Sequence, residues 1–225
     1  MKYHTISTSK TGHGAIFTNA KEAKEYQSDH PGSVYQVFDA IPLKIPAIGM
    51  KTTEPVPSAR SPKATSDEII VYTDGSALNN PGPGGYGVVM QMTNGRTVEI
   101  AQGYTHTTNN RMEMMAVITA LENIEDHDSP VTIHSDSQYT INGIVKGWAK
   151  GWRKRNWKKS DGNPALNPDL WAIMLDLVEQ FPKLTFKWVK GHAGNVLNER
   201  ADVLANSAAS QGGKSLLVDE GYLKK

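Results

Sequence analysis

With 225 residues, of which 38% are hydrophobic and 21% charged, the sequence has the composition of an ordinary globular protein. The absence of cysteine excludes disulfides and thiolate chemistry, so any metal would need oxygen or nitrogen ligands. The net charge is +1, which indicates no particular partner, and no apolar run approaches the roughly 18 residues that cross a bilayer. Because the start also lacks an apolar leader, we expect a cytoplasmic protein without membrane contact.

Three parts are expected along the chain. Residues 1–42 form a small N-terminal segment, with strands predicted at 15–18 and 34–38 and a helix at 19–26. Residues 43–66 are rich in proline and serine, which disfavour the interior of helices and sheets, and they are interpreted as a linker. Residues 67–225 form the main domain.

The main domain alternates strand-like and helix-like patterns. Strands are predicted at 69–72, 84–90, 97–103, 131–135 and 184–189, and helices near 108–121, 138–145, 167–181 and 195–210. Asn94 and Gly95 predict a hairpin turn between the second and third strands. The glycine-rich run 82–87 lacks a Walker lysine and is interpreted as a tight turn that allows close backbone approach. This order predicts an α/β fold in which helices cover a mixed sheet.

Four carboxylates stand out among these elements. Asp74 and Asp136 each follow a predicted strand, where an acid serves either as a turn-former or as a ligand. Glu113 near the start of its helix would also suit the helix dipole, and Asp202 in the closing helix could simply face solvent. Together they favour a hard cation such as Mg²⁺, with two ions activating a water and stabilising the leaving oxygen at phosphorus.

Six motifs make the region from about Asp67 to Lys225 resemble a type I ribonuclease H of the bacterial kind. They are Thr73-Asp-Gly-Ser76, Asn80-Pro-Gly-Pro-Gly-Gly-Tyr-Gly87, Thr107-Thr-Asn-Asn-Arg-Met-Glu-Met114, Ser135-Asp-Ser-Gln-Tyr139, Trp188-Val-Lys-Gly-His-Ala-Gly194 and Asn198-Glu-Arg-Ala-Asp202. The resemblance implies a ribonuclease H-like fold with a mixed five-stranded sheet and Asp74 on the central strand.

The resemblance also implies an activity. This family hydrolyses the RNA strand of RNA–DNA hybrids and leaves 3′-hydroxyl and 5′-phosphate ends. It implies that Asp74, Glu113, Asp136 and Asp202 are both catalytic and metal-binding, with two Mg²⁺ ions and Mn²⁺ able to substitute. His192 matches a catalytic histidine on a loop, although a lone loop histidine is more often inert. A monomer without a protein partner is expected.

Recognition of the hybrid is expected from polar side chains that reach 2′-hydroxyls in the wide minor groove. The positions that match family contacts are Asn80, Asn109, Asn110 and Gln138, with Thr108 and Arg111 expected to contact phosphate. Helix capping is the alternative role for Asn109 and Asn110, and both roles can coexist.

Residues 146–159 contain seven basic side chains, no acidic one, and three of the five tryptophans. This stretch resembles the basic protrusion of the family, and the residues expected to contact the hybrid are Trp148, Lys150, Trp152, Lys154, Trp157 and Lys158. The i, i+4 spacing of Trp148 and Trp152 equally allows that some of these tryptophans attach the protrusion to the domain body.

The first 42 residues resemble a degenerate form of the small hybrid-binding module that precedes some type I enzymes. Where that module carries a stacking tryptophan, this chain has Asn19 and Ala20, and Gln36 and Val37 replace basic residues. A degenerate or repurposed appendage is therefore favoured over hybrid binding. For the main domain, the alternatives are a non-catalytic hybrid-binding protein and another nuclease or transposase of the same fold.

Overall fold

A computed structural model describes residues 3–7, 14–17, 20–28, 34–38, 67–191, 193–211 and 216–223 of the chain. The chain divides into two units, Met1–Ser58 and Ala59–Lys225. The predicted linker 43–66 lies outside the described residues. No helix in the described part of the chain combines the length and the apolar character needed to cross a membrane.

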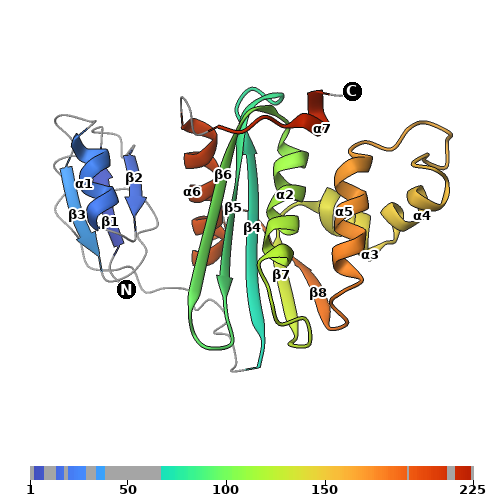
Figure 1. Ribbon diagram of the computed structural model, residues 1–225, viewed down its shortest axis with the longest axis horizontal. Helices are drawn as coiled ribbons and strands as arrows, with labels where there is room; N and C mark the ends of the chain where they lie inside the picture. Colours follow the sequence, from blue (N-terminus) through green and yellow to red (C-terminus); the bar gives the residue numbers. More distant parts are fainter. Residues whose placement is uncertain are drawn as a thin grey trace. The chain divides into compact units, whose positions relative to one another are not determined.

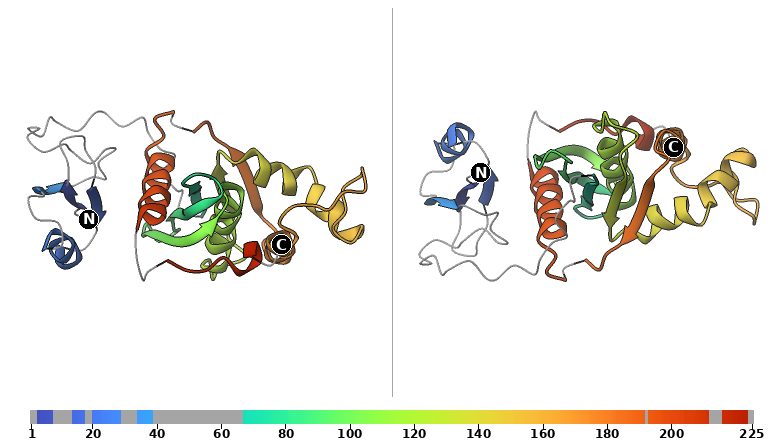
Figure 2. Two further views of the ribbon diagram at one scale, coloured as in Figure 1. Left: turned by 90° about the horizontal axis from the view of Figure 1, so that it is seen from above. Right: turned by 90° about the horizontal axis from the view of Figure 1, so that it is seen from below.

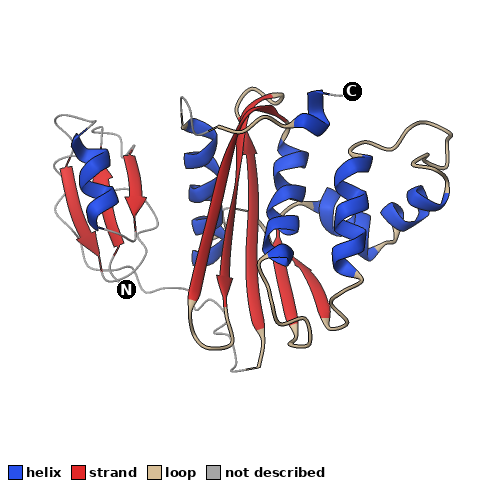
Figure 3. Ribbon diagram, viewed as in Figure 1, coloured by secondary structure: helices blue, strands red, loops and turns tan. Residues whose placement is uncertain are grey.

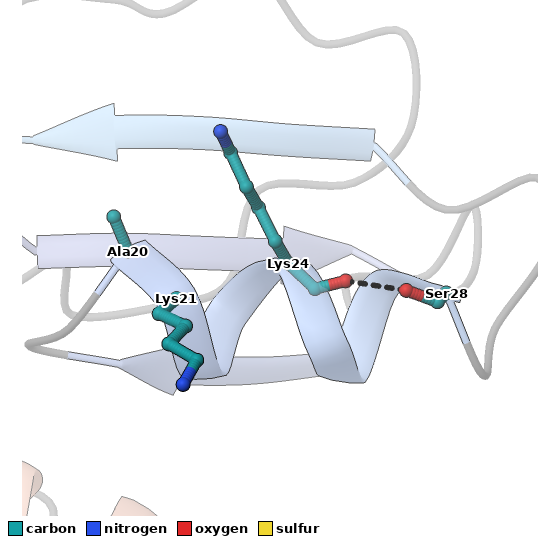
Figure 4. Close-up of a pocket in the computed structure, with 4 residues that line it drawn as sticks. All are labelled: Ala20, Lys21, Lys24 and Ser28. Atoms are coloured by element: carbon teal, nitrogen blue, oxygen red, sulfur yellow. Dashed lines mark hydrogen bonds between the residues drawn. The ribbon is translucent and has the colours of Figure 1, made fainter.

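The first unit contains a three-stranded antiparallel sheet and one helix. Its elements are β1 (Tyr3–Ser7), β2 (Gly14–Phe17), α1 (Ala20–Ser28) and β3 (Val34–Phe38), and the strand order is β2-β1-β3. The sequence pattern predicts β2, α1 and β3 but not the short, largely polar β1. On α1, the side chains of Ala20, Lys21, Lys24 and Ser28 line a hollow of about 430 Å³, and Ser28 donates a hydrogen bond to the Lys24 carbonyl (Figure 4).

The second unit is built on a five-stranded mixed sheet, as the sequence predicts. Its strands are β4 (Ile69–Ala77), β5 (Gly82–Gln91), β6 (Thr97–Thr107), β7 (Val131–Ser135) and β8 (Leu184–Trp188). The order is β6-β5-β4-β7-β8, in which β5 runs antiparallel to β4 and β6 while β7 is parallel to β4 and β8. The central strand is therefore β4, with seven consecutive buried residues.

Helices cover both faces of this sheet (Figures 1 and 3). They are α2 (Asn109–Glu122), α3 (Gln138–Val145), α4 (Trp148–Lys154), α5 (Pro168–Val178), α6 (Val196–Ser210) and α7 (Glu220–Leu223). The larger core cluster joins α2 and α5 to one face of β4, through residues such as Val71, Met112 and Trp171. On the opposite face, Leu197 and Ala201 of α6 pack against Ile70 and Tyr72.

Two helices are not predicted by the sequence pattern. Gly147 and Gly151 interrupt the helical pattern around α4, and α7 has only four residues, so neither has a clear periodicity. Packing of Ala149, Trp152 and Trp157 on the larger core cluster stabilises the α4 region. Packing against the rest of the domain therefore stabilises α4, although its sequence has a low intrinsic helix propensity.

The interpretation of residues 82–87 as a tight turn is wrong, because this run is the first half of strand β5. Its glycines nevertheless allow the expected close approach, and the partner is helix α6. A Cβ atom built on Gly85 would lie 2.6 Å from the Ala209 backbone nitrogen, and one on Gly87 would overlap the Ala201 carbonyl oxygen. The backbones of β5 and α6 are thus in direct contact. Both views of Figure 2 show α6 lying beside the sheet.

Gly87→Ala is expected to lower the free energy of unfolding by at least about 2 kcal/mol, because the added methyl group meets backbone that cannot rotate away. The matched control is Gly151→Ala in α4, where the nearest atom to the new Cβ lies 3.5 Å away and belongs to the flexible Arg155 side chain. That variant should be stabilised by about 0.5–1 kcal/mol through helix propensity. Urea unfolding of both variants checks the pair, and equal effects would contradict it.

Candidate metal centre

Asp74 and Asp136 meet because their strands are parallel neighbours. Strand β4 pairs with β7 so that Thr73 lies opposite Ser135, which places the residue after each at the same end of the sheet. Asp74 is the next residue of β4, and Asp136 is the first residue beyond β7. The two carboxylates therefore lie at the same end of the parallel pair, as predicted for neighbouring strands. The predicted end of the first strand at residue 72 is wrong, because β4 continues through Asp74 to Ala77 as it pairs with β5.

Helix α2 brings Glu113 to the same point. Gly75 permits this approach, since a Cβ built there would overlap the Glu113 backbone nitrogen. One ligand oxygen from each of Asp74, Glu113 and Asp136 lies within 4.8 Å of the others. Three carboxylates from a strand, a helix and a loop thus form one compact cluster.

Burial makes this cluster unstable without a counter-charge. Asp74 is 7% exposed and Glu113 is 6% exposed. Burial, with the negative charges of Asp136 and Asp202, raises the pKa of Asp74 to about 8. Burial and then the charges of Asp74 and Asp136 raise the pKa of Glu113 well above its ordinary value. These are the shifts expected of crowded carboxylates that lack a cation.

The donor set fits a hard divalent cation. All the ligand atoms are carboxylate oxygens, which Mg²⁺ and similar ions prefer. In addition, Oε2 of Glu113 is buried and has no hydrogen-bond partner among the described residues. A buried carboxylate oxygen without a donor is costly, and a cation would satisfy it.

Asp202 lies close to this cluster but is not part of the compact group of three. It is half-buried on α6, and it raises the pKa of Asp74 by its charge and through a hydrogen bond between the two carboxyl groups. The side chain of Asn206 donates a hydrogen bond of 2.6 Å to Oδ1 of Asp202, and Ser76 donates one of 2.6 Å to Asn206. All four predicted carboxylates therefore come from different elements to one end of the sheet.

His192 lies outside the described residues, so its predicted role stays a prediction. Its neighbour Gly191 lies against Asp136, since a Cβ built on Gly191 would be 2.5 Å from Oδ2 of that carboxylate. Trp188, at the end of β8, donates a hydrogen bond of 3.2 Å to the Asp136 carbonyl oxygen. Gly191 and Trp188 thus both lie against Asp136.

Two of the amides expected to read the hybrid, Asn80 and Asn109, make hydrogen bonds that stabilise the fold. Oδ1 of Asn109 accepts the Ala77 backbone N–H at 2.9 Å, and Oδ1 of Asn80 accepts the Asn109 backbone N–H at 3.1 Å. These bonds attach the start of α2 to the β4–β5 connection. Thr108 is the N-cap of α2 without a capping hydrogen bond from its side chain, while Asn110 and Gln138 are exposed.

Arg111 occupies a different environment from the one expected of a phosphate contact. It is 1% exposed, and its guanidinium group makes two-pronged ion pairs with Asp169 of α5 and with Asp219. Asp219 arrives through the C-terminal segment, in which Leu217 forms a bridge to Tyr104 of β6. Arg111 therefore joins three parts of the domain from inside, and this geometry favours a structural role.

The three tryptophans of the protrusion that contains α4 differ in how deeply they are buried. Trp152 packs edge-on against Trp171 with ring centres 5.9 Å apart, and Trp157 packs on the larger core cluster. Trp148 is 41% exposed and lies 6.4 Å from the Trp152 ring. Lys150, Lys154 and Lys158 are all exposed. The alternative interpretation thus fits Trp152 and Trp157, while Trp148 and the lysines remain available for binding.

Three further residues of this site, Ser76, Asn206 and Trp188, were not expected from the sequence to act there. Asn206 follows Asp202 by four positions in α6, which is the spacing of helical neighbours, and Ser76 follows Asp74 by two in β4, which is the spacing of one strand face. These spacings are a signal only once the carboxylates are known to be ligands.

Comparison with known proteins agrees with this geometry. Residues 66–210 match the family described as RNase H. Ribonuclease H of Syntrophus aciditrophicus is 49% identical over 166 residues, which cover 74% of this chain and 93% of that protein. Ribonuclease HI of a Synechocystis species is 47% identical over 161 residues, which cover 72% and 98% of the two proteins.

A solved structure is similar over the same region. The crystal structure of LC9-RNase H1, described as a type 1 RNase H with the type 2 active-site motif, has a TM-score of 0.56 and 33% identity, and the match covers 73% of this chain and 82% of the other. The family match includes β4 to α6 and hence all four carboxylates. The chain therefore belongs to the ribonuclease H family, and within it to type I.

Proposed function

We propose that the protein is an endonuclease that hydrolyses the RNA strand of RNA–DNA hybrids, with the carboxylate cluster as its metal-dependent active site. The observation that carries the proposal is the convergence of Asp74, Glu113 and Asp136 within 4.8 Å in a chain about half identical to ribonucleases H. Structural ion-pair networks also bring charges together, but the three side chains that converge here are all acidic.

The carboxylates would hold two Mg²⁺ ions, with Mn²⁺ able to substitute. Asp74 and Asp136 would bind most directly, and Glu113 and Asp202 would complete the coordination. When bound, such ions activate a water and stabilise the leaving oxygen of a phosphodiester, which would give 3′-hydroxyl and 5′-phosphate ends. The burial that raises the pKa of Asp74 also keeps bulk water away from the ligand oxygens.

The other residues of the site would bind and orient the hybrid. Gln138 follows Asp136 by two residues, and Asn109 and Asn110 lie in the first turn of α2, the helix that carries Glu113. These amides and that of Asn80 carry donors that suit 2′-hydroxyls. Trp148 and the exposed lysines of the protrusion would contact the backbone of the DNA strand. His192 would assist proton transfer or product release. The N-terminal unit is expected to be a degenerate or repurposed appendage rather than a hybrid-binding module, and this stays a prediction, as do the monomeric state and the cytoplasmic location.

The test uses a labelled RNA–DNA hybrid, with duplex DNA and duplex RNA of the same sequence as controls. We expect the full-length protein to cleave only the hybrid, only in its RNA strand, and only with Mg²⁺ or Mn²⁺ present. Excess chelator should abolish cleavage, and added Mg²⁺ should restore it. Binding of the hybrid without cleavage would instead favour a non-catalytic protein, and cleavage of duplex DNA would favour another nuclease of this fold.

A further inference from the structure

We infer that Asn206 is a positioning residue, which orients the carboxylate of Asp202 toward the cation site. The inference rests on the proposed function, because it assumes that Asp202 is a metal ligand. It concerns a residue that follows Asp202 by one helical turn and contacts it directly. The evidence is a continuous set of hydrogen bonds that connects α6 to the central strand.

The set contains two short bonds. Oγ of Ser76 donates to Oδ1 of Asn206 at 2.6 Å, and Nδ2 of Asn206 donates to Oδ1 of Asp202 at 2.6 Å. The chemistry of the partners determines how the amide is turned. An ionised carboxylate can only accept, so the NH₂ group must face Asp202, and the amide oxygen then accepts from the Ser76 hydroxyl.

The residues at the two ends of these hydrogen bonds, Ser76 and Asp202, both lie close to Asp74. Ser76 lies two residues beyond Asp74 on β4, so both side chains project from the same face of that strand. Asp202 in turn interacts with Asp74 through charge and a hydrogen bond. Asn206 therefore connects Asp202 to Ser76, which lies on the same strand as Asp74. This connection is additional to the direct interaction between the two carboxylates.

Asp202 needs such a link more than Asp74 and Glu113 do. Asp74 and Glu113 are buried and confined by packing, whereas Asp202 is half-buried on a helix that faces solvent. A half-exposed carboxylate that rotates must lose that freedom when it binds a cation. By holding Oδ1 of Asp202, Asn206 removes part of that cost before the cation arrives. Hydrogen bonds to metal-ligating side chains commonly change metal affinity by about 10–100-fold.

The test is Asn206→Ala in the full-length protein, measured first by calorimetric titration with Mn²⁺ alone. We expect the affinity of the weaker cation site to fall by about 10-fold. At limiting Mg²⁺, hybrid cleavage should fall by a similar factor, and excess Mg²⁺ should restore it, with the KM for hybrid unchanged. The unfolding temperature of the ion-free protein should stay that of wild type, because Asn206 is exposed.

Two further variants sharpen the test. Ser76→Ala should weaken Mn²⁺ binding less than Asn206→Ala does, and adding it to Asn206→Ala should have no additional effect if both act through one set of bonds. Asn123→Ala is the matched control, because this exposed asparagine at the end of α2 also bonds within its own helix, to the Thr119 carbonyl oxygen. It should leave Mn²⁺ affinity and cleavage unchanged.

The outcomes separate the two claims. If wild type binds Mn²⁺ and cleaves hybrid while Asn206→Ala has the same Mn²⁺ affinity, the inference is overturned and the proposed function stands. A lower unfolding temperature with unchanged Mn²⁺ affinity also overturns it, because the role is then structural. If wild type neither binds Mn²⁺ nor cleaves hybrid, the proposed function fails and the inference fails with it.

Discussion

Asp74→Asn is expected to reduce cleavage of an RNA–DNA hybrid by a factor on the order of 10³ or more, while the protein stays folded. The side chain is 7% exposed and lies in the compact group with Glu113 and Asp136, so an amide there replaces a central ligand oxygen without a change of shape. A labelled hybrid at saturating Mg²⁺ measures the loss. Near-normal activity would contradict the assignment of the metal centre.

The same variant should be more stable than wild type when no cation is present. The pKa of Asp74 is raised from 3.8 to about 8, mainly by burial. Between these two values the folded ion-free protein holds a proton that the unfolded chain has released, so the free energy of unfolding falls as pH rises. Asparagine has no proton to release in this pH range, so the variant does not lose this free energy of unfolding as pH rises. The gain over wild type should grow from about pH 4 to pH 8, where it reaches about 2–4 kcal/mol.

Urea unfolding in chelator, at pH 5 and at pH 8, measures this difference. Saturating Mg²⁺ should raise the stability of wild type and reduce the gap, because a cation that binds only the folded state stabilises it. Asp128→Asn is the matched control, since Asp128 is exposed and lies outside the carboxylate cluster. It should change neither cleavage nor the pH dependence. A gap that does not depend on pH would show that proton binding at Asp74 is not its cause.

Arg111→Ala is expected to have the largest effect on folding, about 3–5 kcal/mol of lost stability. The guanidinium group is 1% exposed and binds Asp219 at 2.6 and 2.7 Å and Asp169 at 3.0 and 2.7 Å. Its removal leaves Asp219, 1% exposed, as a buried charge without its basic partner. Breaking a buried ion pair by removing one partner costs this much because the other charge stays desolvated.

The pKa shifts indicate how this network responds to pH. Burial alone would lower the pKa of Arg111, but its hydrogen bonds to Asp169 and Asp219 outweigh burial and raise it. For Asp169, burial by itself would raise the pKa. The hydrogen bond and the positive charge of Arg111 outweigh burial, so the pKa of Asp169 is lowered. The stabilisation from Asp169 is therefore present at neutral pH and is lost as pH falls below about 4.

Arg153→Ala is the matched control for Arg111. Its ion pair with Asp176 has a similar length, 2.6 Å, but the two side chains are 44% and 59% exposed. An exposed pair contributes at most about 1 kcal/mol, so this variant should unfold almost as wild type does. The contrary result would be an Arg111→Ala protein that keeps its stability and loses affinity for hybrid. That result would restore the phosphate-binding role expected from the sequence.

Much of the site could be predicted from the sequence because two of its carboxylates directly follow apolar runs. Asp74 and Asp136 follow short apolar runs, and runs of that type predict strands whose ends meet at one edge of a sheet. The residues whose roles differ from prediction lie where tertiary packing decides. Arg111 falls between Asn110, expected to bind substrate, and Glu113, expected to bind metal. Only the arrival of Asp169 and Asp219 from distant segments shows that Arg111 is buried.

The sequence was sufficient to predict the five strands of the main domain, helices α2, α3, α5 and α6, the four acidic side chains and the family of the domain, since periodicity and motif spacing are local properties of the chain. The tertiary structure alone decided that the glycines of β5 lie against α6, that Arg111 is internal, and that Asn206 reaches Asp202 and Ser76 together. The physical reason is that burial and hydrogen-bond partners depend on contacts between distant segments, and a side chain's chemistry follows from those contacts.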